Sequence, residues 1–314
     1  MSLLKSFKLT QDDFSMVGTS LNRPECVWYD HDGLWVSDSR GGIAKVVKDS
    51  PPILTGSGIE IPNGFCRMVD GSFLVAGLGD GKLHRIFPNG KTEVFFSTLE
   101  VESSGVVNHC SCDRHGRVWI SVMTRLKRWD DSLTTRNPDG YIVLKQRNKA
   151  QIVADDLDLT NEVKLSPDGK YLYAAESLGR RIVRFPIKSN FTLGNKEVFG
   201  PSDLGPGANP DGFTFDEEGN VWAVIIAKNG ITIITKEGST IDVFEDIKRE
   251  ALDEWILRCN ELTANASHLA NCAGDFLKLP TSLAFGGADR KTVFIGSLLM
   301  PHLYSFRSPI AGPK

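Results

Sequence analysis

The chain has 314 residues, of which 41% are hydrophobic and 24% are charged, with a formal net charge of −3 and a pI near 6.1. This composition is typical of a soluble globular protein, and its slight negative charge gives no electrostatic basis for binding nucleic acid. No stretch approaches the roughly 18 consecutive apolar residues that a membrane span needs, so a membrane protein is not expected.

The first predicted element is a strand near the N-terminus. The opening residues MSLLKSFKLTQDDF contain only a short apolar stretch before Lys and Asp interrupt it, so they do not predict a secretory signal, and we expect a cytoplasmic protein. The segment from Phe7 to Val17 can supply a strand to the last unit of the repeat described next.

The rest of the chain contains six similar units. In five of them a polar or acidic residue, here called the anchor, opens a short apolar run, and a turn glycine follows eight positions later. These pairs are Glu25 and Gly33, Asn63 and Gly71, Asn108 and Gly116, Asn161 and Gly169, and Asp211 and Gly219. The sixth unit begins at the anchor Thr281 and turns at Asp289–Arg290, without a glycine.

Each turn is followed by a second apolar run, and further strand patterns and hairpin turns follow in most units. The second runs are LWVSD, FLVAG, VWISV, YLYAAE, VWAVI and TVFIGS. Self-similarity at intervals of about 40–50 residues, with several short strands in each unit, is typical of a propeller. We therefore predict an all-β fold, a six-bladed β-propeller, as a single domain over residues 1–314. The N-terminal strand would close the ring and remove an exposed sheet edge.

A helical segment interrupts the β pattern at about residues 245–270. In EDIKREALDEWILRCNELTANASHLA the apolar residues recur at steps of three and four, with Trp255 and Leu262 on one face, and Gly274 can end the run. The spacing predicts one or two short helices inserted before the last blade, on the face where the anchors lie. The insertion either caps that blade or forms a lid over a pocket.

The cysteines fit a reducing compartment. Four of the six lie within predicted first strands: Cys26, Cys66, Cys110 and Cys112. Cys110-Ser-Cys112 lacks a second pair at zinc-ribbon spacing, so no structural zinc site of that kind is predicted. Cys259 and Cys272 lie in the insertion. They can pair under oxidising conditions, but reduced packing fits a cytoplasmic protein better.

The anchors predict a metal site. The first strand of every blade lines the central axis, so the anchors of all six blades point into one shared pocket. Carboxylates at Glu25 and Asp211, with amide oxygens at Asn108 and Asn161, are ligands for a hard divalent cation. The set lacks thiolate and imidazole and therefore favours one Ca²⁺, with Mg²⁺, Mn²⁺ or Zn²⁺ possible. The alternative is that these residues only hydrogen-bond the strand openings.

Five segments carry a resemblance to a known family. They are RPECVWYD, VNHCSCDRHGRVWISV, TNEVKLSPDGKYLYAAE, NPDGFTFDEEGNVWAV and LPTSLAFGGADRKTVFIGS. They resemble the successive motifs of the gluconolactonase/senescence-marker-protein/luciferin-regenerating-enzyme family, over about residues 24–306. The resemblance implies a six-bladed propeller with one catalytic divalent cation on its axis and lactone hydrolysis as the activity. It implies that Glu25, Asn161 and Asp211 are metal ligands and that Asn108 is a further ligand or a substrate contact.

Two departures from the family pattern bear on the substrate. Sugar-lactonase members commonly carry Arg two residues before the third-blade Asn and Asp directly after it, where this chain has Val106 and His109. Loss of the forked donor and gain of an aliphatic side chain favour a lactone less polar than a simple sugar lactone. His109 is a candidate substrate contact, although strand alternation can turn it sideways. Asn63 and Thr281 are further candidate substrate contacts.

The predicted activity is metal-dependent hydrolysis of a lactone, an ester-bond hydrolase reaction. The cation would polarise the carbonyl, and Asp211 would act as the general base for water attack. No G-x-S-x-G motif indicates a covalent nucleophile. A calcium-dependent phosphotriesterase-like hydrolase and a non-enzymatic protein-binding propeller remain alternatives. The expected partner is a small-molecule lactone or ester, and the expected state is a monomer or weak dimer.

Overall fold

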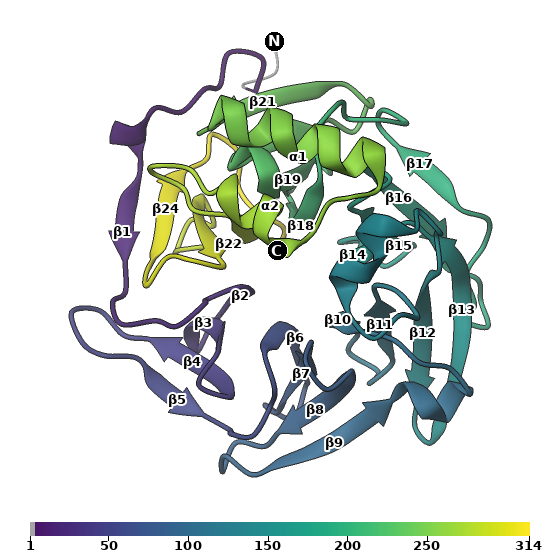
Figure 1. Cartoon of the computed structure of the whole chain (residues 1–314). Coiled ribbons are helices and arrows are strands. Elements are labelled where there is room, and N and C mark those ends of the chain that lie inside the picture. The colour runs from purple at the N-terminus through teal and green to yellow at the C-terminus, as the bar shows by residue number, and fades with distance from the viewer. Residues whose placement is uncertain (1–3) are drawn as a thin grey trace.

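The protein is a ring of six four-stranded antiparallel sheets around a central axis (Figure 1). The computed structural model describes residues 4–314, so residues 1–3 of the expected domain lie outside the described part. The predicted all-β, six-bladed β-propeller is confirmed, as is a helical insertion before the last blade.

Every blade contributes one strand to each of four concentric positions. The innermost strands are β2 (Val27–Asp30), β6 (Pro62–Arg67), β10 (Val107–Cys112), β14 (Thr160–Leu165), β18 (Pro210–Phe215) and β22 (Pro280–Gly286). The second strands are β3 (Gly33–Asp38), β7 (Phe73–Gly77), β11 (Val118–Val122), β15 (Tyr171–Glu176), β19 (Val221–Ile225) and β23 (Thr292–Ser297). The third strands are β4 (Gly42–Val46), β8 (Lys82–Ile86), β12 (Gly140–Gln146), β16 (Arg181–Pro186), β20 (Gly230–Ile234) and β24 (Leu303–Arg307). The outer strands are β5 (Ile53–Thr55), β9 (Thr92–Ser97), β13 (Lys149–Leu157), β17 (Glu197–Phe199), β21 (Thr240–Phe244) and β1 (Ser15–Val17).

The hydrophobic core lies between neighbouring blades. The second strands are rich in β-branched and aromatic residues, and β11 and β19 are buried at every position because blades cover both of their faces. One core cluster joins Leu74 and Leu83 of the second blade to Val107, Val118 and Ile120 of the third. Packing between blades therefore holds the inner strands, and with them the anchors, around the axis.

The N-terminal segment closes the ring as predicted. Strand β1 pairs antiparallel with β24, and Met16 lies opposite Tyr304. Just before β1, the ring of Phe14 lies in edge-on contact with those of Phe244, Phe276 and Tyr304, with centroids 4.9–6.0 Å apart. The strand pairing and this aromatic cluster together fix the N-terminal segment to the fifth and sixth blades.

We expect Phe14→Ala to lower the free energy of unfolding by about 3 kcal/mol, the lower end for Phe→Ala in a core, because the ring is only partly buried. Met16→Ala, in the adjacent strand, is the matched control. Its side chain is exposed, so we expect a change within about 0.5 kcal/mol. Urea unfolding of both variants measures the difference. Equal, small effects would show that closure does not depend on the aromatic cluster.

The turns explain the spacing between anchors and glycines. All five predicted turn glycines have positive φ, a region that glycine enters without strain. At Gly116 φ is +76°, and an added Cβ would meet nothing within 4 Å, so the backbone conformation alone requires glycine there. In the sixth turn Arg290 adopts φ of 58° instead. The sixth unit therefore keeps the turn although it lacks the glycine.

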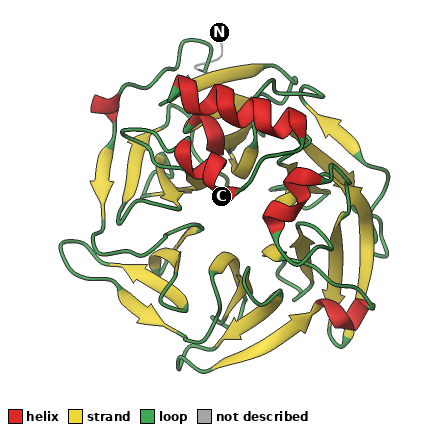
Figure 2. Ribbon diagram, in the orientation of Figure 1, coloured by secondary structure: helices red, strands yellow, loops and turns green. Residues whose placement is uncertain are grey.

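Two α-helices within residues 4–314 lie over one face of the propeller, above the fifth and sixth blades (Figure 2). Helix α1 (Arg249–Glu261) and helix α2 (Ala266–Asn271) form the insertion expected at about 245–270. Short 3₁₀ segments add η1 (Gln11–Asp13), η2 (Thr98–Val101), η3 (Trp129–Thr134) and η4 (Ile226–Lys228). In the described residues no helix has the length and apolar character to span a bilayer.

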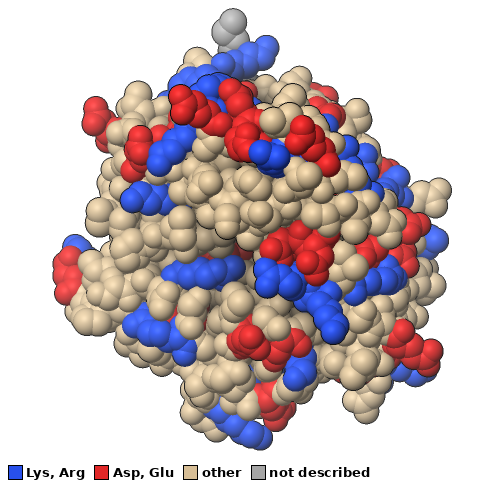
Figure 3. All heavy atoms as spheres, viewed as in Figure 1, with Lys and Arg blue, Asp and Glu red and all other residues tan. Residues whose placement is uncertain are grey.

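The face that carries the helices shows basic and acidic side chains interspersed, without a broad patch of one sign (Figure 3). The six cysteines are all free thiols, including Cys259 and Cys272 of the insertion.

Candidate functional site

A β-bulge accompanies most of the anchors. The pairing between the innermost and second strands shifts register at Asn63, Asn108, Asn161, Asp211 and Thr281. Glu25 lies just before its strand, β2. A bulge changes the direction in which a side chain points and is common beside active sites. The repeated irregularity explains how the anchors of these five strands point toward one axis.

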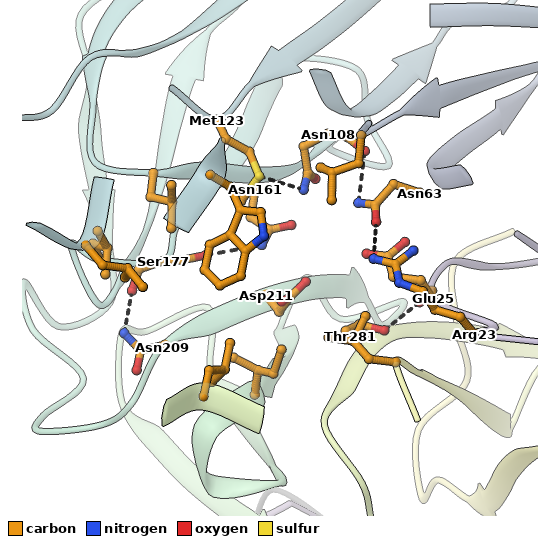
Figure 4. A pocket seen from close by; sticks show the side chains of 18 of the residues that line it. Arg23, Glu25, Asn63, Asn108, Met123, Asn161, Ser177, Asn209, Asp211 and Thr281 are labelled. Atoms are coloured by element: carbon orange, nitrogen blue, oxygen red, sulfur yellow. Dashed lines mark hydrogen bonds between the residues drawn. The ribbon is translucent and has the colours of Figure 1, made fainter. Parts of the chain in front are cut away.

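The anchors meet at the floor of one cavity, as the sequence predicted (Figure 4). All six line it: Glu25, Asn63, Asn108, Asn161, Asp211 and Thr281. Each side chain is buried, and Asp211 is the most exposed at 8%. The structure thus brings the predicted oxygen donors together at one end of the axis, on the lining of a single cavity.

Two asparagines are held with their oxygens directed into the site. Asn108 Nδ2 donates to the sulfur of Met123 at 3.2 Å, and Asn161 Nδ2 donates to Ser177 Oγ at 3.3 Å. The Oδ1 atoms of both residues are buried without a hydrogen-bond partner. The donor end of each amide is therefore engaged, while the acceptor end remains available to a cation.

The two carboxylates show the same feature. Glu25 Oε2 and Asp211 Oδ1 are buried and have no hydrogen-bond partner. Burial, followed by the negative charges of Glu25 and Glu162, raises the pKa of Asp211 well above its usual range. Burial is also the main cause of a raised pKa at Glu25. Two carboxylates and two amide oxygens, all buried and each with an unpaired oxygen, fit a hard divalent cation.

Asn63 and Thr281 differ from the other anchors because their polar groups are already used. Asn63 Oδ1 accepts from Arg23 at 2.9 Å, and its Nδ2 donates to the carbonyl of Asn108 at 3.2 Å. Thr281 Oγ1 donates to the carbonyl of Glu25 at 2.7 Å. Both residues line the cavity, but their side chains hydrogen-bond neighbouring blades. They therefore lie beside the proposed metal ligands without an unpaired oxygen of their own.

Sequence reasoning missed several polar residues of the site. Arg23 and Asn209 each stand two positions before an anchor, and both line the cavity together with Ser177. The Arg23 guanidinium also donates to the carbonyl of Pro62 at 3.0 Å. The signal that could have found Arg23 and Asn209 is their position two residues before an anchor, where the third blade has Val106. The arginine absent from the third blade thus has a counterpart that enters from the first.

Two predicted substrate contacts lie outside this cavity. Val106 is buried in a small cluster with Met123 and Leu159, behind the cavity wall. His109 is 2% exposed and lines a different cavity together with Cys26 and Lys164. Neither side chain is among those that line the anchor cavity.

The helical insertion forms part of the cavity wall. Trp255 of α1 and Leu269 of α2 line the cavity, and Trp255 Nε1 donates to Asn209 Oδ1 at 2.9 Å. Leu252, rather than Leu262, shares the buried face with Trp255. Leu262 ends α1 with φ of 59° and is 37% exposed, so its expected place on that face was wrong. The unpredicted segment η3 contributes Trp129 and Leu133 to the wall.

Comparisons with known proteins agree with this architecture. The family model described as the SMP-30/Gluconolactonase/LRE-like region matches residues 24–246. A 6-deoxy-6-sulfogluconolactonase of Pseudomonas putida is 23% identical over 185 residues, which cover 59% of this chain and 51% of that protein. The chain therefore spans about half the length of this curated relative.

Two solved structures share the fold. A luciferin-regenerating enzyme superposes with a TM-score of 0.69 at 16% identity, covering 95% of this chain and 97% of that one. A calcium-binding regucalcin from Agrobacterium tumefaciens gives a TM-score of 0.63 at 16% identity, covering 95% and 91%. At these identities the likeness concerns the fold alone. The family match, which covers most of the chain, together with the six blades and the ring of anchors, shows that this protein belongs to the SMP-30/gluconolactonase/LRE-like family.

Proposed function

We propose that the protein is a metal-dependent lactonase that opens a cyclic ester less polar than a simple sugar lactone. The observation that carries the proposal is the set of four buried, unpartnered oxygens at one cavity floor, on Glu25, Asn108, Asn161 and Asp211. Membership of a gluconolactonase-like family and the similarity to a sulfogluconolactonase support lactone hydrolysis as the reaction class.

Glu25, Asn161 and Asp211 would hold the cation, with Asn108 as a fourth protein ligand. Their chemistry favours calcium, and a calcium-binding regucalcin shares the fold. When bound, the cation supplies Lewis-acid stabilisation of the negative charge that develops on the lactone carbonyl oxygen. An unpaired buried polar group costs about 1–3 kcal/mol, so four such oxygens argue against a ring used only for packing.

Asp211 is the proposed general base. As water attacks the carbonyl carbon, Asp211 takes one proton from that water, and the carbon–oxygen bond of the ring then breaks. The same carboxyl returns the proton to the departing alkoxide oxygen, so the product is a hydroxy acid and Asp211 is restored. Glu25 is proposed to act only as a ligand. Its backbone carbonyl accepts a hydrogen bond from Thr281 Oγ1.

The walls of the cavity support a less polar substrate. Above the polar floor, aliphatic residues from several blades line it, among them Leu78, Leu159, Leu178, Ile226 and Leu298. These side chains offer apolar contact to the substituent of a lactone but no partner for sugar hydroxyl groups. Arg23 at the floor adds a polar contact close to the anchors, so the expected substrate combines an oxygen-rich reacting end with an apolar body.

The insertion is proposed to act as a lid that selects the substrate. Its buried face packs with Leu133 and Ile226 beside the cavity mouth, and Trp255 reaches the wall itself. A cover of this kind excludes water and contacts the body of the substrate. Replacing residues 249–271 by a short Gly/Ser turn should keep calcium binding but change the relative kcat/KM among lactones.

A point variant tests the lid without removing a packed segment. Trp255→Ala should change the ratio of kcat/KM between a long-chain and a short-chain alkyl lactone about tenfold, because the methylenes of the longer chain lose contact area. Leu257→Ala, on the outward side of α1 and 47% exposed, is the matched control and should leave the ratio unchanged. If Trp255→Ala and Leu257→Ala both keep the wild-type ratio of kcat/KM between the two lactones, α1 does not select substrate.

A substrate screen tests the proposed function directly. The full-length protein is assayed against alkyl lactones, sugar lactones, aryl esters and a phosphotriester, each in calcium and in chelator. We expect calcium-dependent ring opening, fastest for alkyl lactones. Preferred turnover of the phosphotriester would favour the phosphotriesterase alternative, and a lack of calcium-dependent hydrolysis of every substrate would contradict the proposal.

A further inference from the structure

A second layer of residues lies directly after the anchors along each inner strand. In blade order these residues are Cys26, Gly64, His109, Glu162, Gly212 and Ser282. Three of the blades thus contribute a side chain that can bind a metal, two contribute glycine and one contributes serine. The anchors supply only oxygen, whereas this layer combines sulfur, nitrogen and oxygen.

The three metal-binding side chains meet on the axis. The ligand atoms of Cys26, His109 and Glu162 all lie within 4.8 Å of one another. His109 Nε2 is 3.8 Å from Glu162 Oε1, and the three residues are at most 2% exposed. The bulges at Asn108 and Asn161 interrupt strand alternation. They explain how two consecutive residues of one strand can both direct their side chains toward the axis.

The glycines of this layer leave the room that the cluster occupies. A Cβ at Gly64 would clash with the ring of His109, and a Cβ at Gly212 would clash with the carbonyl of Thr281 and with the carboxyl group of Glu162. Alanine at either position would therefore displace a member of the cluster. The second and fifth blades leave space for side chains that come from the third and fourth.

Two buried polar atoms of the cluster lack hydrogen-bond partners. They are His109 Nδ1 and Glu162 Oε1. The other oxygen of Glu162 is engaged, because Lys164 Nζ lies 2.7 Å from Oε2 and the amide of Phe213 donates to it at 3.1 Å. Lys164 and Phe213 therefore fix the carboxylate while Oε1 still faces the imidazole.

A second cavity borders the cluster on the side away from the anchor cavity. Cys26, His109 and Lys164 line a cavity whose other walls include Tyr29 of β2 and His31 of the first turn. Because the turns lie at the far ends of the inner strands, this cavity opens on the opposite side from the lid. Cys26 and His109 therefore border a cavity that none of the anchors lines.

We infer that Cys26, His109 and Glu162 form a second cation site, selective for zinc or a similar borderline metal over calcium. Sulfur and imidazole donors favour such metals, whereas the anchor ring favours hard cations. Neighbouring ligands of tetrahedral zinc lie roughly 3.5 Å apart, a spacing that small side-chain rotations can reach from the observed positions. The thiol releases its proton to solvent on binding, and thiolate and carboxylate then balance the divalent charge. The inference does not depend on lactone hydrolysis.

Cobalt spectroscopy tests this site separately from the anchor ring. The full-length protein is stripped of metal, saturated with calcium and titrated with Co²⁺. We expect one equivalent of Co²⁺ to bind despite the calcium, with a thiolate-to-cobalt charge-transfer band in the near ultraviolet. Zinc should displace the cobalt and abolish the band. Wild-type protein without such a band would overturn the inference.

Cysteine variants identify the ligand. Cys26→Ser should lose the charge-transfer band while still binding calcium. Cys66→Ser, which alters another thiol that lines the same cavity, should keep the band. A band that survives in Cys26→Ser, or that disappears in Cys66→Ser, would contradict the assigned ligands.

X-ray absorption of the zinc-loaded wild type keeps the test decisive if Cys26→Ser does not fold. The site predicts one sulfur at about 2.3 Å and nitrogen or oxygen ligands at about 2.0–2.2 Å from zinc. A shell without sulfur would contradict the inference. Because the ion would tie the first, third and fourth blades together, zinc added to calcium-saturated protein should also raise Tm.

Discussion

Asp211→Asn is expected to lower kcat by about 10²–10⁴-fold while calcium binding weakens less than in Glu25→Gln. The amide keeps one oxygen that can bind the cation, but it cannot take a proton from water, and general-base catalysis contributes a factor of this size. Calcium affinity by isothermal titration and kcat at saturating calcium separate the two effects. Asp211 and Glu25 both line the cavity floor, so the contrast between them isolates the proton transfer.

Asp168→Asn is the matched control because the tripeptide Pro-Asp-Gly recurs along the chain, at residues 138–140, 167–169 and 210–212. Pro167-Asp168-Gly169 forms a turn whose Asp is exposed, whereas Pro210-Asp211-Gly212 places its Asp at the buried floor. The control should retain full kcat and calcium affinity. If Asp211→Asn and Glu25→Gln lose kcat equally, and calcium loss accounts for both, Asp211 is a ligand without a role as base.

Removal of calcium is expected to abolish hydrolysis and to lower Tm by roughly 5 °C relative to protein at calcium concentrations near 100 times Kd. A ligand that binds only the folded state adds about 2.7 kcal/mol at that saturation, and each kcal/mol corresponds to roughly 2 °C in a chain of this size. The physical source is the relief of unpaired, buried oxygens at the axis. Differential scanning fluorimetry in calcium and in chelator measures the shift.

Glu25→Gln should lose most of this calcium-dependent shift in Tm, because a buried ligand loses its charge. Glu60→Gln, at an exposed carboxylate, is the control and should keep the shift. Identical melting curves in calcium and in chelator for the wild type would mean that the unpaired oxygens do not form a cation site.

The regular spacing made the fold and the anchors predictable. An anchor followed by a turn at a constant distance fixes the length of the inner strand, and six copies require that equivalent residues lie around one axis. In the sixth unit Arg290, nine positions after Thr281, takes the positive-φ conformation that glycine has in the other turns. Local turn chemistry combined with repetition was therefore sufficient to place Glu25, Asn161 and Asp211 together.

The direction of neighbouring side chains was not predictable from strand alternation. The bulge at Asn108 breaks that alternation, and His109 faces a region of the axis outside the anchor cavity. Val106, at the offset that Arg23 and Asn209 use to reach the cavity, packs behind the wall instead. Such choices depend on the packing of adjacent blades, which the sequence of one blade does not contain.

The part of the cavity wall formed by α1 and η3 depends on contacts between residues far apart in the chain. Trp255 reaches Asn209 across 46 positions, and η3 brings Trp129 and Leu133 over the axis from the third blade. The helical spacing of the insertion predicted α1 and α2, but it did not show that Leu262 ends α1 in an exposed position. Tertiary packing therefore determines which apolar residues line the anchor cavity.

The most direct test of the cation site at the anchors is an anomalous difference map from crystals of the full-length protein grown in calcium, recorded at long wavelength. We predict a peak at the cavity floor, within bonding distance of Glu25, Asn161 and Asp211, with Asn108 beside it. Glu25→Gln crystals grown in the same way should show a weaker peak. A map that lacks density there, from protein that still opens lactones, would contradict the account.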